Sequence, residues 1–183
     1  MPHRLSAALL AVAFCILAAC APQGEPASPP APPPEPPNTA SVPQETTAYT
    51  FTDALGNQVT VDRPQRVVSF YGSFAEMWLL AGGELAGTTD DAVTERKLPL
   101  GEEVSIVGKA QSPNLELTLS LEPDLALLSA DSDAHVKAAE TLRAAGIPCA
   151  FFQVNALDEY VAAMEICTGI TGRADLFEEN ALS

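Results

Sequence analysis

Side chains that could carry out acid–base or metal chemistry are few in this sequence. Its two histidines are His3 and His135, whereas a metal cage needs several converging ligands and a hydrolase needs a base beside its nucleophile. We therefore interpret His135 as a surface or helix-face residue and assign no metal ligand. The acidic pairs Asp90-Asp91 and Glu102-Glu103 are typical of solvated loops, although paired acids can also act as a general acid and base. The pattern predicts neither an enzyme nor a bound cofactor.

The tripeptide Tyr71-Gly72-Ser73 is the feature that best suits ligand binding. It places an aromatic ring, a flexible backbone and helix-end N–H groups where a small molecule could approach. The alternative is purely structural: Ser73 caps a helix, with Glu76 completing a capping box, while Tyr71 covers the core. The residues alone leave both interpretations open.

The amino terminus has the pattern of a lipoprotein signal peptide over residues 1–19. Arg4 precedes an apolar run that ends in Leu17-Ala18-Ala19-Cys20, and this run is too short for a permanent membrane helix. Cys20 is therefore the expected lipidated residue; an ordinary cleaved signal with an incidental cysteine is the alternative. Of the later cysteines, Cys149 and Cys167 match no metal motif. They could form a disulfide or remain two buried thiols.

Residues 20–48 are expected to be the lipidated cysteine followed by a proline-rich, disordered linker. Ten of the 16 prolines lie between Ala21 and Pro43, and a segment so poor in large apolar residues cannot bury a core. We interpret it as a spacer, with a proline-motif ligand as the alternative. The formal net charge of the chain is −15, which leaves no basic patch for nucleic acid.

Strand and helix patterns alternate through the rest of the chain. A hairpin is predicted from residues 49–52 and 58–61, with Gly56 in the turn. Strands are predicted at residues 66–70, 85–88, 105–107, 125–128 and 147–154. Helices are predicted to begin at Ser73, at Ser112-Pro113, at Asp133 and at Asn155 with Asp158, and the first should end at Gly82-Gly83.

The segment from Asn114 to Leu121 is ambiguous, because its leucines alternate with period two as in a strand. We favour a helix because of the neighbouring cap and prolines. Alternating strands and helices imply an α/β fold with a Rossmann-like, mostly parallel sheet, helices on both faces and the hairpin in front. Ligands collect at the carboxyl ends of such strands, so the loops after Phe70, Thr88, Val107 and Leu128 are the candidate binding loops.

Five segments of the chain, taken in order, form one set of motifs. They are the hairpin and strand of residues 51–69, Ala81-Gly82-Gly83, Gly87-Thr88-Thr89-Asp90, the stretch from Pro113-Asn114-Leu115-Glu116 to Leu121-Glu122-Pro123-Asp124-Leu125, and Ala145-Gly146-Ile147-Pro148 before Thr168-Gly169-Ile170-Thr171-Gly172-Arg173. Together they resemble the metal-chelate class of periplasmic binding proteins, which includes siderophore-, haem- and cobalamin-binding lipoproteins. The resemblance implies a first lobe over residues 49–173 and the start of an interlobe helix over residues 174–183. The second lobe is expected to be missing.

The resemblance also implies a substrate-binding lipoprotein that serves the permease and ATPase of an ABC importer. Glu116, in the family's Asn-Leu-Glu motif, would dock against permease arginines; otherwise it is an early-helix acid favoured by the helix dipole. Lys109-Ala110-Gln111 stands where cobalamin-binding relatives have an aromatic residue, so a ferric siderophore is favoured over cobalamin or haem, and Lys109 would suit an anionic chelate. One wall of the site is expected to consist of Tyr71, Ser73, Asp90, Lys109, Gln111 and Asp131.

Two functions of other classes remain open. One is a surface interaction module that does not take part in transport. The other is a chelatase-like or redox enzyme, which would need a metal-inserting histidine or a reactive thiol. For the favoured function we expect a monomer held by its lipid anchor on the outer face of the cell membrane, or within the periplasmic envelope, and no nucleic-acid partner.

Overall fold

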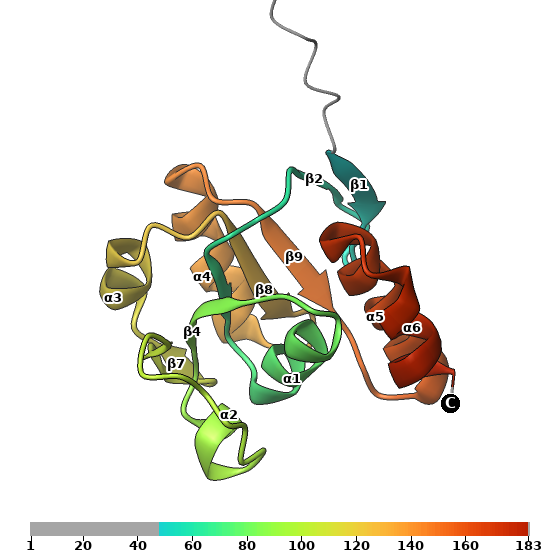
Figure 1. Cartoon of the computed structure of the whole chain (residues 1–183). Helices are drawn as coiled ribbons and strands as arrows, with labels where there is room; N and C mark the ends of the chain where they lie inside the picture. Colours follow the sequence, from blue (N-terminus) through green and yellow to red (C-terminus); the bar gives the residue numbers. More distant parts are fainter. Residues whose placement is uncertain (1–47, 183) are drawn as a thin grey trace, which may run out of the picture. The chain divides into compact units, whose positions relative to one another are not determined.

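The structure of this chain is a computed structural model that describes residues 48–182 (Figure 1). The predicted signal peptide, the lipidated Cys20 and the proline-rich linker up to residue 47 lie outside the described residues. Within residues 48–182, none of the helices combines the length and apolar character needed to cross a membrane.

A five-stranded parallel sheet forms the centre of the fold, as predicted. Its strands are β3 (Val67–Ser69), β4 (Leu85–Thr88), β5 (Ser105–Ile106), β8 (Leu125–Ser129) and β9 (Cys149–Phe152). They lie in the order β5-β4-β3-β8-β9, and every neighbouring pair is parallel. Two small antiparallel pairs accompany the sheet: β1 (Tyr49–Thr52) with β2 (Gln58–Val61), and β6 (Gly108–Lys109) with β7 (Ser112–Pro113).

Helices cover both faces of this sheet. They are α1 (Gly72–Leu80), α2 (Asp91–Thr94), α3 (Leu115–Ser120), α4 (Asp133–Ala144), α5 (Leu157–Thr171) and α6 (Ala174–Ala181). In Figure 1, α5 and α6 lie side by side, and the β1–β2 hairpin lies beside α5. The expected arrangement of a hairpin followed by an α/β sheet is confirmed.

Successive side chains of a strand point to opposite faces of the sheet, so the sheet has an apolar core on each face. Leu125 and Leu127 pack with buried residues of α1 and α5 on one face of the sheet. Ala126 and Leu128 pack with buried residues of α4 on the other face. All five residues of β8 are buried, because a central parallel strand is covered on both sides.

Helix α3 resolves the ambiguity between a helix and a strand in favour of the helix. Leu115 and Leu119 pack against the core beneath α4, whereas Leu117 is 36% exposed. Residues four apart lie on one face of a helix. Leu115 and Leu119 therefore face the core from the same side of α3, and Leu117 lies on its exposed side.

The predicted capping residues are wrong at the helix starts, by one or two positions. Helix α1 begins at Gly72 with Tyr71 at the cap position, so Ser73 lies inside the helix and makes no capping box. Ser112-Pro113 belongs to β7, and Asn114 caps α3 by accepting a hydrogen bond from the Leu117 N–H. At α3 the β6–β7 pairing keeps Ser112 and Pro113 extended, so the first free helical N–H groups come two residues later than predicted, whereas α1 begins earlier than predicted.

The caps of the two later helices also differ from the prediction. Ser132, not Asp133, caps α4 by accepting from the His135 N–H. Helix α5 has Ala156 at its cap position, without a side-chain bond, in place of the predicted Asn155 and Asp158. Instead, the Glu159 carboxylate accepts a hydrogen bond from the Asn155 N–H at 2.6 Å. Helices α1, α3, α4 and α5 lie in the predicted segments, whereas the short α2 was not predicted.

Cys149 and Cys167 are two buried free thiols, the second of the two alternatives left open by the sequence. Cys149 packs in the core beneath α4, and Cys167 packs in the core beneath α1 and α5. The sheet therefore separates the two sulfur atoms. Burial raises the pKa of Cys149 to about 11 and that of Cys167 to about 12.

We expect both thiols to be nearly unreactive in the folded protein. At pH 8 a thiol with a pKa of about 11 is ionised in about one molecule in a thousand, and the thiolate is the reactive form. In a chain carrying Cys15→Ser and Cys20→Ser, a disulfide-forming thiol reagent should react at least about 100-fold more slowly than in denaturant. Two thiols titrated rapidly under native conditions would contradict the buried placement.

Candidate functional site

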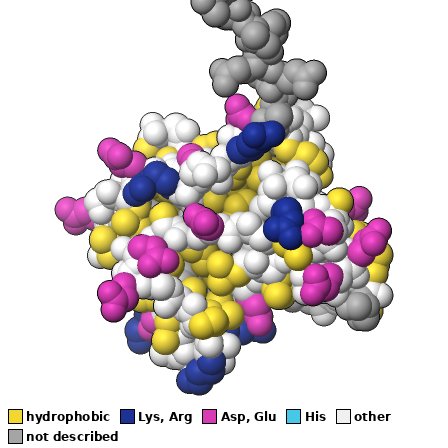
Figure 2. Space-filling view, in the orientation of Figure 1, with side chains coloured by type: hydrophobic (Ala, Val, Ile, Leu, Met, Phe, Trp, Pro, Cys, Tyr) yellow, Lys and Arg dark blue, Asp and Glu magenta, His cyan; other side chains and the backbone are white. Residues whose placement is uncertain are grey.

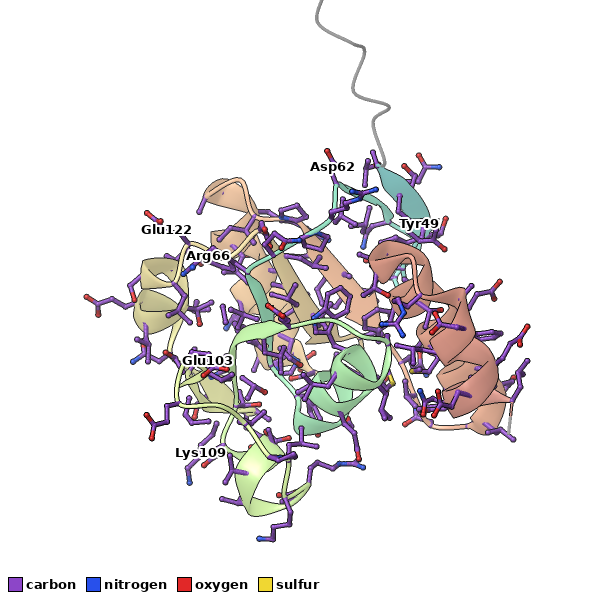
Figure 3. The ribbon with its side chains drawn as sticks, in the orientation of Figure 1. Tyr49, Asp62, Arg66, Glu103, Lys109 and Glu122 are labelled. Carbon is purple, nitrogen blue, oxygen red and sulfur yellow. The ribbon has the colours of Figure 1, made fainter. Side chains whose placement is uncertain are left out.

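An open pocket of about 370 Å³ lies at the carboxyl edge of the sheet. It is lined by Tyr71 from the β3–α1 loop, by residues of the β4–α2 segment and by the turn between β6 and β7. The lining residues are Tyr71, Asp90, Asp91, Thr94, Glu95, Lys109, Ala110 and Gln111. We refer to this set as the carboxyl-edge pocket. Figure 3 shows Lys109 at the end of the molecule that carries α2.

Four of the six predicted ligand-binding residues meet in this pocket: Tyr71, Asp90, Lys109 and Gln111. Ser73 does not, because it lies within α1 and lines a separate pocket of about 280 Å³ with Arg96 and Tyr160. Asp131 is exposed after β8 and accepts a hydrogen bond from Asn155 at 3.0 Å. The structure therefore brings residues from the first three predicted loops to one pocket and places Ser73 and Asp131 elsewhere.

Glu116 is exposed in the first turn of α3. It lies outside the lining of the carboxyl-edge pocket. This exposure leaves its carboxylate free of the core. Both predicted roles, docking to a permease and interaction with the helix dipole, are compatible with the position.

Backbone hydrogen bonds join the β6–β7 turn to the end of β4. The Val107 N–H donates to the Thr88 carbonyl at 2.8 Å, and the Asp90 N–H donates to the Gly108 carbonyl at 2.9 Å. Gly108 has a φ of +105°, a backbone conformation that favours glycine. The turn that carries Lys109 is thus held beside Asp90, although 19 residues of sequence separate them.

Asp91 corrects the interpretation of Asp90-Asp91 as solvated loop acids. Its Oδ2 atom accepts a hydrogen bond from the Gly72 N–H at 2.7 Å, and its Oδ1 atom accepts from the Thr89 hydroxyl at 2.6 Å. The first N–H of α1, which the sequence offered to a ligand, is therefore already bonded. Asp91 holds α1 and α2 together behind the pocket.

His135 corrects a second interpretation, because the ring is fully buried and not on the surface. The Ser129 N–H donates to its Nδ1 atom at 2.9 Å, and its Nε2 atom lies 2.7 Å from the Ala110 carbonyl oxygen. Burial lowers the pKa of His135 below its usual 6.5, against smaller upward shifts from the bond to Ala110 and from the charge of Asp91.

Acidic groups dominate the charge of the carboxyl-edge pocket. Asp90, Asp91 and Glu95 line it, with Lys109 as the cation among its lining residues. Lys109 alone would favour an anionic chelate, as the sequence predicted, but these three carboxylates outnumber its single positive charge. Figure 2 shows further Asp and Glu side chains spread over the visible face, consistent with the net charge of −15. The local field favours cations.

Metal-binding clusters are absent from the described part of the chain: residues 48–182 contain no group of three or more His, Cys, Asp or Glu side chains placed to hold an ion. The polar pocket residues that sequence reasoning missed are Asp91, Thr94 and Glu95. Their position directly after a predicted binding loop was the available signal. The link between Ala110 and His135 joins segments 25 residues apart and has no local signature.

Comparison with known proteins gives consistent matches. A sequence profile of the family described as periplasmic binding protein matches residues 67–180. The solved structure of the siderophore-binding protein BauB, bound to ferric iron and two acinetobactin molecules, has a TM-score of 0.63 and 22% identity, covering 74% of this chain and 50% of that one. A variant of the haem-binding protein HmuT has a TM-score of 0.59 and 20% identity, covering 74% and 44%.

The periplasmic vitamin B12-binding protein BtuF of Vibrio cholerae is a third similar structure. Its TM-score is 0.57 with 21% identity, covering 66% of this chain and 46% of that one. The chain thus spans half or less of the length of these three proteins. A search of the curated proteins found no match. At these identities the structural likeness establishes a shared fold.

Proposed function

Because this chain belongs to the periplasmic binding protein family, we propose that it captures a metal chelate for an ABC importer, with a ferric siderophore as the cargo. One observation carries the proposal: Tyr71, Asp90 and the Lys109–Gln111 turn, from three separate loops, converge on one open pocket at the carboxyl edge of the sheet. Bulky ligands bind at this edge of open α/β sheets. Members of this family are binding proteins, so the proposed role needs no catalytic group.

The similar structures support this class of cargo. One of these proteins is bound to a ferric siderophore complex, another binds haem and a third binds vitamin B12. All three ligands are coordinated metals in large organic frames. Haem and cobalamin are therefore the second candidates. The ferric siderophore is preferred because the pocket lining is mostly polar, with Tyr71 as its one aromatic ring.

The charge of the pocket narrows the class of chelate. Three carboxylates against one lysine repel an anionic complex and attract a neutral or cationic one. At about 6 Å in water, one charge pair is worth about 0.7 kcal/mol, or roughly threefold in Kd. We therefore propose a neutral or positively charged ferric chelate, such as a trihydroxamate.

We expect the unlipidated Cys20→Ser chain to bind ferrioxamine B, a monocationic ferric trihydroxamate, more tightly than the trianionic ferric enterobactin. Isothermal titration calorimetry at low salt measures both affinities, with haem and cobalamin in parallel. Asp90→Asn and Glu95→Gln should each weaken ferrioxamine B roughly threefold, because each removes one attractive charge.

The matched control is Glu178→Gln on α6, which removes an equal charge from an exposed position away from the pocket lining. This variant should leave both affinities unchanged. A tighter complex with the trianion would reject the charge assignment. If none of the four chelates binds saturably, the proposal that this pocket captures a chelate is wrong.

Delivery to a transporter forms part of the same proposal. We propose that Glu116 pairs with an arginine of the permease, since an exposed carboxylate can make a charge-assisted, two-point contact with a guanidinium group. We also propose that Cys20 carries a lipid that tethers the protein to the membrane. The family implies a periplasmic or envelope location, which agrees with such a tether.

A further inference from the structure

The crevice between β3 and β8 is the topological switch point of the sheet. From β3 the chain continues to β4 and β5 on one side, whereas from β8 it continues to β9 on the other. Loops diverge at such a point and leave a crevice at the carboxyl edge. Here His135 occupies it: its ring packs edge-on against Phe70 and Tyr71, with ring centroids 5.6 and 5.8 Å apart.

Hydrogen bonds define the protonation state of this ring. A backbone N–H can only donate, so the Nδ1 atom that receives the Ser129 N–H carries no proton. A backbone carbonyl can only accept, so the Nε2 atom beside the Ala110 oxygen must carry one. His135 is thus a neutral imidazole in a single tautomer, with both nitrogens bonded to the backbone of different loops.

We propose that His135 is a positioning residue that clamps the β6–β7 turn against Tyr71 and thereby holds the two sides of the carboxyl-edge pocket at a fixed separation. Ala110 lies between Lys109 and Gln111, so the bond to its carbonyl fixes the turn from behind. The contact with Tyr71 fixes the opposite side. This inference rests on the proposed function, because it assigns the residue that shapes the same pocket.

Protonation should release the clamp. An added proton on Nδ1 would face the Ser129 N–H, so two donors would meet where one bond had been. The cation would also be buried, which is unfavourable unless it is paired. The titratable groups around the ring are Tyr71, which contacts it, and Asp91, whose charge favours the cation. Burial exceeds the effect of Asp91 and lowers the pKa of the ring.

The sign of the pH dependence follows from that direction. Above pH 6.5, the ordinary pKa of histidine, the His135 ring is neutral and the clamp is intact, because burial lowers the pKa of this ring. It remains intact somewhat below 6.5, because the pKa of His135 is lowered in the folded protein. The pocket should therefore open, and ligand affinity should fall, only as the pH drops through this lowered pKa.

A ligand-free experiment tests the clamp directly. In the ¹⁵N-labelled chain with His3→Ala, Cys15→Ser and Cys20→Ser, long-range ¹H–¹⁵N spectra report the protonation of each ring nitrogen of His135. We expect the Nε2–H form at pH 7.5. On titration to pH 4.5, the amide signals of residues 109–111 should shift with the same midpoint as the ring. Amides that stay unchanged while the ring titrates, or an Nδ1–H form at pH 7.5, would overturn the proposal.

Ligand binding supplies the second readout, with ferrioxamine B as the probe at pH 7.5 and pH 5.0. His135→Phe should bind about tenfold more weakly at both values, because both bonds are lost. His135→Gln keeps an amide that can donate to Ala110, so it should retain most of the affinity and lose the acid-dependent part. If the wild-type chain fails to bind the probe, the proposed cargo is wrong, and the spectra alone decide the role of His135.

Discussion

Gly72→Ala is expected to destabilise the protein by roughly 2 to 3 kcal/mol and to weaken ligand binding at least about tenfold, which corresponds to about 1.4 kcal/mol. A methyl group at this position would stand 2.6 Å from the Ala92 nitrogen and 2.8 Å from the Ala92 Cα atom. Both are backbone atoms, so the clash cannot be relieved by turning a side chain. Urea denaturation and titration with ferrioxamine B measure the two effects.

The double effect arises because Gly72 touches α2, which carries the acidic side of the carboxyl-edge pocket. Moving α2 away would stretch the hydrogen bond from the Gly72 N–H to Asp91 and displace Glu95 with it. Gly101→Ala is the matched control, since its methyl group would meet the carboxylate end of the exposed Glu103, which can rotate away. A Gly72→Ala protein with an unchanged urea midpoint would show that the two helices do not pack this closely.

The loops at the carboxyl ends of the strands are the parts of the site that could be predicted from the sequence. The loops containing Tyr71, Asp90 and Lys109 follow strands whose apolar runs are evident, and parallel strands place their carboxyl ends together. Ser73 and Asp131 also follow strand ends, yet Ser73 lines a different pocket and Asp131 accepts a hydrogen bond from Asn155. Whether a side chain near a strand end faces the pocket depends on where its helix begins, and the helix starts were the least accurate part of the prediction.

Buried polar residues show the limit of local patterns more clearly. His135 looks like an ordinary helix residue in sequence, because its partners Ser129 and Ala110 are backbone groups. Any residue has a backbone N–H and carbonyl, so no residue type marks the partner. Asp91 is similar, since one of its two partners is the N–H of a glycine 19 residues away. Periodicity locates the apolar faces, but the polar contacts between loops depend on the assembled fold.

Asp53 illustrates the same limit in the hairpin, where the sequence predicted the turn from Gly56 but not the group that stabilises it. Its side chain is 5% exposed. One carboxylate oxygen accepts from the Leu55 N–H at 3.0 Å and the Asn57 N–H at 2.8 Å, and the other accepts from the Phe151 N–H at 3.4 Å. One side chain therefore closes the β1–β2 turn and attaches it to β9.

Asp53→Ala should consequently lower the free energy of unfolding by about 3 kcal/mol, because three backbone N–H groups, including that of the buried Phe151, would lose their acceptor. Urea denaturation followed by circular dichroism measures the loss, and fluorescence of the buried Trp78 provides a second probe. Asp158→Ala is the control: this exposed aspartate on α5 should cost less than about 0.5 kcal/mol. Asp53→Asn, which keeps one carbonyl acceptor, should fall between the two. Equal midpoints for Asp53→Ala and Asp158→Ala would mean that the hairpin does not depend on this carboxylate for its attachment to the sheet.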